Sequence, residues 1–246
     1  MTRYFLRIPI EFQTLELLIE EILDIRHKKH VHLLAASTLV ESSRDPDLHA
    51  VLMDGFNICD SRPLSIYFKF FGSKQSNVRG TTIMFEAIKT SNSSLSHYFL
   101  GLQDDSLSKF RDKLLLLNHS LKITRINTDI IDVDNQLQVQ DLILDIENSN
   151  SDVVWLGVGS PKQDFLAAKI AQHCNSNTIA VGAAFDFIAG TKTSAPVIIQ
   201  KLSLEWFFRL LQEPRRLWRR YFFGNIKFIM LCFVDFTKKI MKVKSP

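Results

Sequence analysis

Three segments of this sequence each contain a short apolar run followed by residues that could do chemistry. They are V-V-W-L-G-V-G-S-P-K-Q-D at residues 153–164, A-V-G-A-A-F-D-F-I-A-G at 180–190 and N-I-C-D-S-R-P-L at 57–64. Ligands of open parallel sheets bind beyond the carboxyl ends of the strands. If the apolar runs are such strands, the polar residues after them are candidates for binding and for acid–base chemistry.

The motif at 153–164 predicts a strand that turns directly into a helix. Ser160 stands where a helix N-cap belongs, and Pro161 stands at the first helical position, where its missing N–H costs nothing. Backbone N–H groups of such a turn can hold a phosphate or a sugar hydroxyl, and Lys162 and Gln163 add side-chain donors. An ordinary capped turn without a ligand explains the same pattern.

Two carboxylates are candidates for a general base. Asp60 follows an apolar run and precedes Ser-Arg-Pro, and a well-placed base at a strand end accelerates a reaction by roughly 10²- to 10⁴-fold. Asp54, in the nearby Met-Asp-Gly, is the competing choice. The alternative for Asp60 is a carboxylate that only caps a turn.

Asp186 and Arg79 are further candidates for a binding site. Asp186 lies between two phenylalanines, and a carboxylate in an apolar setting needs a partner or a ligand. Arg79 has a forked guanidinium that can clamp a diphosphate. A structural turn at Asp186 and an ordinary surface arginine at 79 are the alternatives.

Histidine and cysteine usage does not indicate a metal site. His27, His30 and His32 lie among Arg and Lys with no carboxylate cluster, so we interpret them as a solvated basic turn that leads into a strand. The cysteines at 59, 174 and 232 are widely separated and show no C-x-x-C spacing. Neither a zinc knuckle nor a disulfide framework is indicated, and a reducing compartment fits.

The chain alternates between apolar runs typical of strands and segments with helical spacing. The expected strands lie at 31–35, 97–101, 121–125, 153–159 and 178–185, with helical patterns between them such as 15–23 and 110–117. This alternation predicts an α/β fold with a mainly parallel, doubly wound sheet and helices on both faces.

The last part of the chain has a different composition. Residues 201–246 hold 11 Lys and Arg against 3 Asp and Glu, whereas the whole chain carries a net charge of only +4. Aromatic and aliphatic residues interleave with these cations at helical spacing, so we expect two or three amphipathic helices, broken at Pro214 and Gly224. We therefore divide the chain into a core, 1–195, and a basic amphipathic C-terminal appendage, 196–246.

This appendage favours a phosphate-rich partner. The segment 213–225 combines arginines with Trp and Phe, which is typical of a helix that lies in a lipid headgroup layer. A helix packed on the core with a solvated charged face is the alternative. Nucleic acid is not expected, because no recognition motif accompanies the charge.

No segment predicts a membrane span or a cleaved signal. The longest uncharged apolar run near the C-terminus is 228–234, whereas a span needs about 20 residues. Arg3, Arg7 and Glu11 interrupt the apolar residues at the N-terminus, so we expect the mature chain to begin at Met1.

Taken together, the motifs resemble the WecG/TagA/CpsF family, also called glycosyltransferase family 26. G-x-G-S-P-K-Q-D, G-A-A-F-D-F-x-A-G, A-P and L-E-W-F-F-R-L-x-Q-E-P-R-R-L-W-R-R-Y followed by G-N stand in the family's order between about 153 and 225, and a weaker match extends to about residue 30. The resemblance implies a Rossmann-like core. It also implies inverting transfer from a UDP-sugar to a polyprenyl-diphosphate-linked saccharide in the synthesis of bacterial exopolysaccharide, capsule or another surface glycan.

The resemblance also implies roles for individual residues. Asp60, twelve residues before Gly72 of Phe-Phe-Gly, corresponds to the family's proposed base. Gln163 matches the donor-site glutamine, and Arg79 resembles the arginine of the V-R-G form. We assign donor binding to Ser160, Lys162, Gln163, Asp186 and Arg79, and contacts with the acceptor diphosphate and the membrane to Arg209, Arg215, Arg216, Trp218, Arg219 and Arg220.

Four positions depart from the family pattern: Leu33, Ala35, Ser61 and Thr82. The nearby Ser37 and Thr38 can supply polar groups in place of those missing at 33 and 35. The departures motivate an alternative function, a non-catalytic partner in a polysaccharide assembly complex that binds nucleotide-sugar or lipid diphosphate.

The remaining expectations concern cofactors, assembly and location. We expect a metal-independent reaction without a cofactor, in which cationic side chains neutralise the diphosphate. The resemblance also allows a homo-oligomer with its site near a subunit boundary. We expect a cytoplasmic protein bound peripherally to the inner face of the plasma membrane.

Overall fold

The computed structural model describes residues 2–74, 77–191, 210 and 214–243. Its strands are β1 (Thr2–Phe5), β2 (Ile8–Glu11), β3 (His30–Leu34), β4 (Phe56–Cys59), β5 (Ser96–Leu100), β6 (Lys122–Asn127), β7 (Val153–Leu156) and β8 (Asn177–Ala180). Its helices are α1 (Leu15–Leu23), α2 (Ala36–Ser42), α3 (Pro46–Asp54), α4 (Arg62–Lys69), α5 (Gly80–Thr90), η1 (Asp104–Ser106), α6 (Leu107–Leu117), α7 (Gln136–Ser149), α8 (Lys162–His173), α9 (Ala184–Ala189) and α12 (Pro214–Val243).

The strands form one sheet in the order β1-β2-β4-β3-β8-β7-β5-β6. Only the β1–β2 pair is antiparallel, and the other pairs are parallel. The predicted α/β fold with a mainly parallel sheet is therefore confirmed. The expected strands correspond to β3, β5, β6, β7 and β8.

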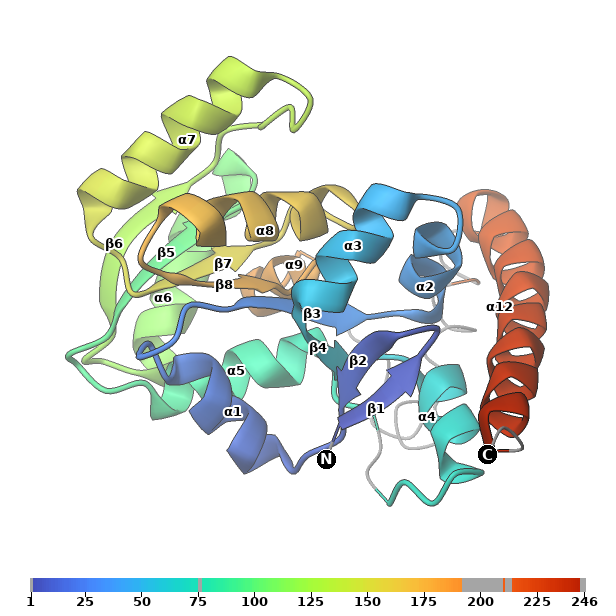
Figure 1. The fold of residues 1–246 in the computed structure, drawn as a ribbon. Helices are drawn as coiled ribbons and strands as arrows, with labels where there is room; N and C mark the ends of the chain where they lie inside the picture. Colours follow the sequence, from blue (N-terminus) through green and yellow to red (C-terminus); the bar gives the residue numbers. More distant parts are fainter. Residues whose placement is uncertain (1, 75–76, 192–209, 211–213, 244–246) are drawn as a thin grey trace.

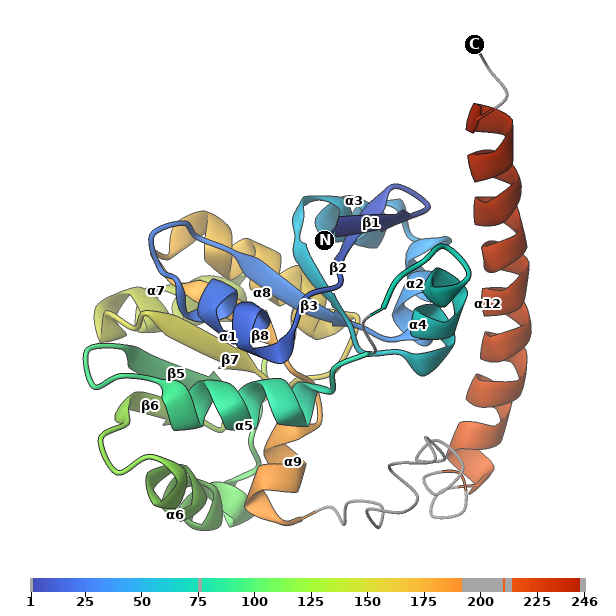
Figure 2. The same ribbon diagram turned by 90° about the horizontal axis from the view of Figure 1, so that it is seen from below.

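Helices cover both faces of the sheet (Figures 1 and 2). Helices α1, α5, α6 and α9 pack on one face around the buried Trp155 and Phe99. On the other face, α7 and α8 pack over Tyr98 and Leu156, while α2, α3 and α4 surround Leu34. Because the central strands are buried on both faces, β5 and β7 have no exposed residue.

The β1–β2 hairpin was not expected from the sequence. Its two turn residues, Leu6 and Arg7, both have positive φ values of 49° and 76°. Two-residue hairpin turns with this backbone usually carry Asn, Asp or Gly, so the composition of this turn gave no signal. The hairpin lies beside β4 at the edge of the sheet.

Helix α12 is one continuous helix of 30 residues. The expected boundary at Pro214 agrees with its start, but the expected break at Gly224 is wrong. A glycine inside a helix costs about 1 kcal/mol relative to alanine, and tertiary contacts offset this cost: Phe228 is buried against Phe5, with ring centroids 5.7 Å apart. Helix α12 lies along α2 and α4 (Figure 2). The proposed boundary at 195–196 falls outside the described residues.

Candidate functional site

The carboxyl ends of four neighbouring parallel strands lie side by side and form one edge of the sheet, which we call the sheet edge. The strands are β4, β3, β8 and β7. Asp60 directly follows β4, and its backbone N–H donates to the carbonyl of Leu34 at the end of β3, at 3.1 Å. The N–H of Val78 donates to the carbonyl of Cys59 at 2.8 Å. The backbone segments that carry Asp60 and Arg79 therefore both flank the carboxyl end of β4.

The start of α5 packs closely against the same edge. A Cβ atom on Gly80 would lie 2.8 Å from both Leu33 Cδ1 and the carbonyl oxygen of Val181. Only glycine allows this approach, which places the half-buried Arg79, the N-cap residue of α5, near the ends of β3 and β8. Leu33 is a core side chain here, so this departure from the family pattern serves packing.

Asp54 lies at the opposite edge of the sheet, beside the amino end of β3. Its carboxylate is 90% exposed and stands 3.4 Å from Nε2 of His30, the first residue of β3. Asp60 is half-buried and stands beyond the last residue of β4. Of the two candidate bases, only Asp60 is at the edge where the other candidates gather.

The turn after β7 differs from its prediction. Helix α8 begins at Lys162 with Pro161 at the N-cap, and the Ser160–Pro161 peptide bond is cis. Ser160 does not cap the helix, because its hydroxyl donates to Oδ2 of Asp164 at 2.6 Å and lies 3.3 Å from the hydroxyl of Thr38 on α2. The capping prediction is therefore wrong, and Ser160 instead links α8 with α2.

Gln163 shapes the turn from inside. Its side chain is 5% exposed, and its Oε1 accepts from the backbone N–H of Gly159 at 3.1 Å. A Cβ on Gly182 would lie 3.7 Å from the amide, so Gln163 stands between the ends of β7 and β8. The N–H of Gly159 is one of the backbone donors of this turn, and it is used within the turn.

The interpretation of His32 as part of a solvated turn is wrong. His32 is fully buried on β3, and its Nδ1 lies 2.8 Å from Oδ1 of Asp164, itself 2% exposed. His30 is half-buried with its Nδ1 2.8 Å from His32 Nε2, and only His27 is exposed. The alternation His-Val-His places both rings on one face of a strand, which was the available sequence signal.

The other residues assigned to donor binding lie in the first turns of α8 and α9. Asp186 is half-buried in the first turn of α9, and Lys162 is exposed at the start of α8. Ser61, another departure, is buried and caps α4 by accepting from the N–H of Leu64 at 3.4 Å. Thr82 is half-buried on α5.

The assigned acceptor residues lie on α12, with one exception. Arg215, Arg216, Trp218, Arg219 and Arg220 stand in its first turns, whereas Arg209 lies outside the described residues. Trp218 is 47% exposed. In the part of the chain that the structure describes, no helix is long and apolar enough to cross a membrane.

Two Asp-x-Asp sequences elsewhere in the chain have local structural roles. Asp45 of Asp-Pro-Asp caps α3 through the N–H groups of Asp47 and Leu48, and Asp132 of Asp-Val-Asp accepts from the N–H of Asp134. Among the described residues, no group of three or more His, Cys, Asp or Glu is arranged to hold a metal ion.

This architecture defines the class of the protein: a doubly wound α/β protein whose candidate ligand site lies where its central strands end. A model of one protein family, described as the glycosyl transferase WecG/TagA/CpsF family, matches residues 3–241. The chain belongs to this family, as the motifs predicted, and is thus assigned to the glycosyltransferases.

Proposed function

We propose that this protein is an inverting glycosyltransferase that moves a sugar from a UDP-sugar to a saccharide on polyprenyl diphosphate, in the synthesis of a bacterial surface glycan. The observation that carries the proposal is the position of Asp60. It is a partly exposed carboxylate at the sheet edge, beside the end of β3 and next to the segment that carries Arg79.

In the proposed reaction, Asp60 removes the proton of the acceptor hydroxyl. The hydroxyl oxygen attacks the anomeric carbon from the face opposite UDP, the bond from that carbon to the diphosphate oxygen breaks, and UDP leaves with the electron pair. Arg79 would neutralise the diphosphate charge that develops, which lowers the barrier for departure. Lys162 and Asp186 would contact the donor from α8 and α9, and no metal is invoked.

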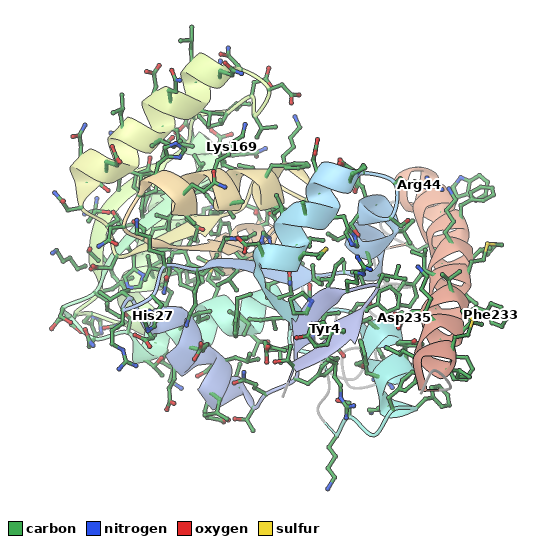
Figure 3. All side chains as sticks on the ribbon, in the orientation of Figure 1. Tyr4, His27, Arg44, Lys169, Phe233 and Asp235 are labelled. Carbon is green, nitrogen blue, oxygen red and sulfur yellow. The ribbon has the colours of Figure 1, made fainter. Side chains whose placement is uncertain are left out.

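Helix α12 has two unlike faces, which supports a membrane-bound site. Phe228 and Asp235 are buried on its inner face, whereas Ile229, Met230 and Phe233 are each more than 60% exposed. Phe233 points away from the body of the protein (Figure 3). Exposed apolar groups on a helix that also carries many lysines and arginines suit the headgroup layer of an anionic membrane.

We propose that α12 lies on the inner face of the plasma membrane and brings its first turns toward the lipid-linked acceptor. There, Arg215, Arg216, Arg219 and Arg220 would bind the diphosphate of the acceptor, and Trp218 would enter the headgroup layer. The sheet edge would thereby receive a substrate that stays attached to the bilayer.

Acceptor-dependent release of UDP tests the chemistry. A panel of UDP-sugars is combined with lipid-diphosphate-linked saccharides in detergent, and Asp60→Asn is compared with the wild type. We expect a loss of roughly 10²- to 10⁴-fold, whereas the matched control Asp54→Asn retains activity. Full activity of Asp60→Asn would place the base elsewhere. Wild-type protein that binds UDP but releases none from any pair would favour the non-catalytic alternative.

Sedimentation with vesicles tests the membrane proposal. We expect the wild type to bind vesicles that contain anionic lipid more strongly than neutral ones, and Phe233→Ser to weaken this binding. Leu137→Ser is the matched control, because Leu137 is 71% exposed on the distant α7. Equal binding by the two variants would contradict the assignment of the α12 face.

A further inference from the structure

The hydroxyl of Ser160 is oriented by a buried carboxylate. Asp164 accepts the Ser160 proton on Oδ2 at 2.6 Å, while its Oδ1 lies 2.8 Å from Nδ1 of His32. The carboxylate and the imidazole are both essentially inaccessible to water. A buried donor or acceptor without a partner would cost free energy there. The positions of the protons are therefore strongly constrained.

The carboxylate sets the direction of the hydrogen bonds that it receives. An ionised carboxylate only accepts, so His32 donates from Nδ1 to Asp164. His30 Nδ1 lies 2.8 Å from Nε2 of His32 and continues the line of hydrogen bonds. Burial lowers the pKa of His30. The line of hydrogen-bonded groups from His30 through His32 ends at Asp164.

The hydroxyl of Ser160 likewise has one defined donor role and one defined acceptor role. A serine hydroxyl has one proton and two acceptor sites, and the proton of Ser160 points to Asp164. Thr38, at 3.3 Å, must therefore donate to Ser160. Ser160 is only half-buried, and because its proton is donated to Asp164, its oxygen can only accept a further hydrogen bond.

We infer that Ser160 accepts a hydrogen bond from a hydroxyl or amide N–H of the donor sugar, and that Asp164 and His32 are positioning residues that fix this polarity. This inference rests on the proposed function. A diphosphate oxygen carries no proton and cannot donate to Ser160, whereas every sugar hydroxyl can. Ser160 therefore favours the sugar over the diphosphate group to which it is joined, and titration with UDP alone separates the sugar from the ribose and uracil donors of the nucleotide.

Calorimetric titration with UDP and with a panel of UDP-hexoses and UDP-N-acetylhexosamines tests this inference. Loss of one hydrogen bond in Ser160→Ala should weaken binding of the preferred UDP-sugar by about three- to tenfold and leave the affinity for UDP unchanged. Ser160→Thr keeps the hydroxyl and should retain most of the affinity for the sugar nucleotide.

Asp164→Asn tests the positioning role. Its amide can donate to Ser160 and turn the hydroxyl proton toward the ligand, so it should reproduce the selective loss of UDP-sugar affinity. In a Ser160→Ala background it should add little, because both substitutions remove the same interaction. A merely structural role of Asp164 would lower the affinities for UDP and UDP-sugar together.

The outcomes separate the two proposals. Wild-type protein that binds UDP but gains nothing from any attached sugar overturns this inference, as does an equal loss of UDP and UDP-sugar affinity in Ser160→Ala. Wild-type protein that binds neither UDP nor a UDP-sugar overturns the proposed function. If Asp164→Asn does not fold, Ser160→Ala and Ser160→Thr, which alter no buried charge, decide the question.

Discussion

Two buried carboxylates, Asp164 at the sheet edge and Asp235 on α12, join distant parts of the chain by different chemistry. Asp235 is 4% exposed and accepts from three donors: the backbone N–H of Leu6 at 2.8 Å, the hydroxyl of Tyr67 at 2.6 Å and the ammonium of Lys239 at 2.6 Å. Figure 3 shows it on the side of α12 that faces the β1–β2 hairpin. Asp164 has a histidine and a hydroxyl as partners instead.

The difference lies in how the charge is balanced. Lys239 neutralises Asp235, and its ammonium also lies 4.7 Å from the ring centroid of Phe71 and 5.2 Å from that of Tyr67. Such a pair holds α12 in place but presents nothing to a ligand. Asp164 has no lysine or arginine among these partners, so its charge instead aligns the protons of neighbouring polar groups. One carboxylate anchors an element, and the other sets the hydrogen-bonding character of a site.

The largest effect on stability is expected at Asp235. Asp235→Ala leaves the charge of Lys239 and the hydroxyl of Tyr67 without their partner, at a cost of about 3 kcal/mol, the low end for a broken buried pair because Lys239 is partly exposed. Urea unfolding measures the loss. Burial raises the pKa of the Cys232 thiol to about 12, so faster alkylation of Cys232 would report release of α12. Lys238→Ala, at an exposed site nearby, should change neither measurement.

A substitution at Gly55, which lies beside His32, tests the role of the other carboxylate, Asp164, through that histidine. A Cβ on Gly55 would lie 2.5 Å from His32 Cδ2, so Gly55→Ala should cost about 2 kcal/mol by overpacking. It should also shift His32 relative to Asp164 and selectively weaken UDP-sugar binding. Gly224→Ala on α12, where the added methyl group meets no atom within 4 Å, should instead stabilise the protein by up to about 1 kcal/mol. Unchanged sugar selectivity in Gly55→Ala would argue against the role of His32.

His97 shows how a buried polar group behaves with no carboxylate as a direct partner. It accepts from the indole N–H of Trp155 and lies 2.7 Å from the hydroxyl of Ser91, and burial lowers its pKa to about 4. The unfolded chain binds a proton near pH 6.5 and the folded chain does not. Stability should therefore fall by about 2 kcal/mol between pH 7 and pH 5. His97→Gln should flatten this dependence in denaturant titrations, while His27→Gln, at an exposed site, should not.

The smallest effect separates the contributions to the α12 contact. Tyr67→Phe removes one donor to Asp235 and leaves the other two in place, so it should cost about 1 kcal/mol. A loss as large as that of Asp235→Ala would mean that the hydroxyl, instead of the lysine, dominates the contact. Thermal unfolding of both variants under the same conditions makes this comparison.

Much of the fold could be predicted because its signals are local. Apolar runs with helical segments between them identified β3, β5, β6, β7 and β8, and a strand end before Asp60 was anticipated. The β1–β2 hairpin has no local signal, because its turn uses Leu6 and Arg7. Gly224 predicts a break in α12, and the burial of Phe228 outweighs its cost. In both cases contacts with distant residues decided the outcome.

The sequence by itself determined the family, the alternating α/β pattern and the set of polar residues that follow strands. Those properties depend on residue types and short spacings, which a chain carries whether or not it is folded. The tertiary structure decided that Asp60 and Asp54 lie at opposite edges, and that His32 meets Asp164 across 132 positions of the chain. Such pairings depend on strand order and on burial, because a hydrogen bond between groups so far apart in sequence forms only when packing brings both of them out of water.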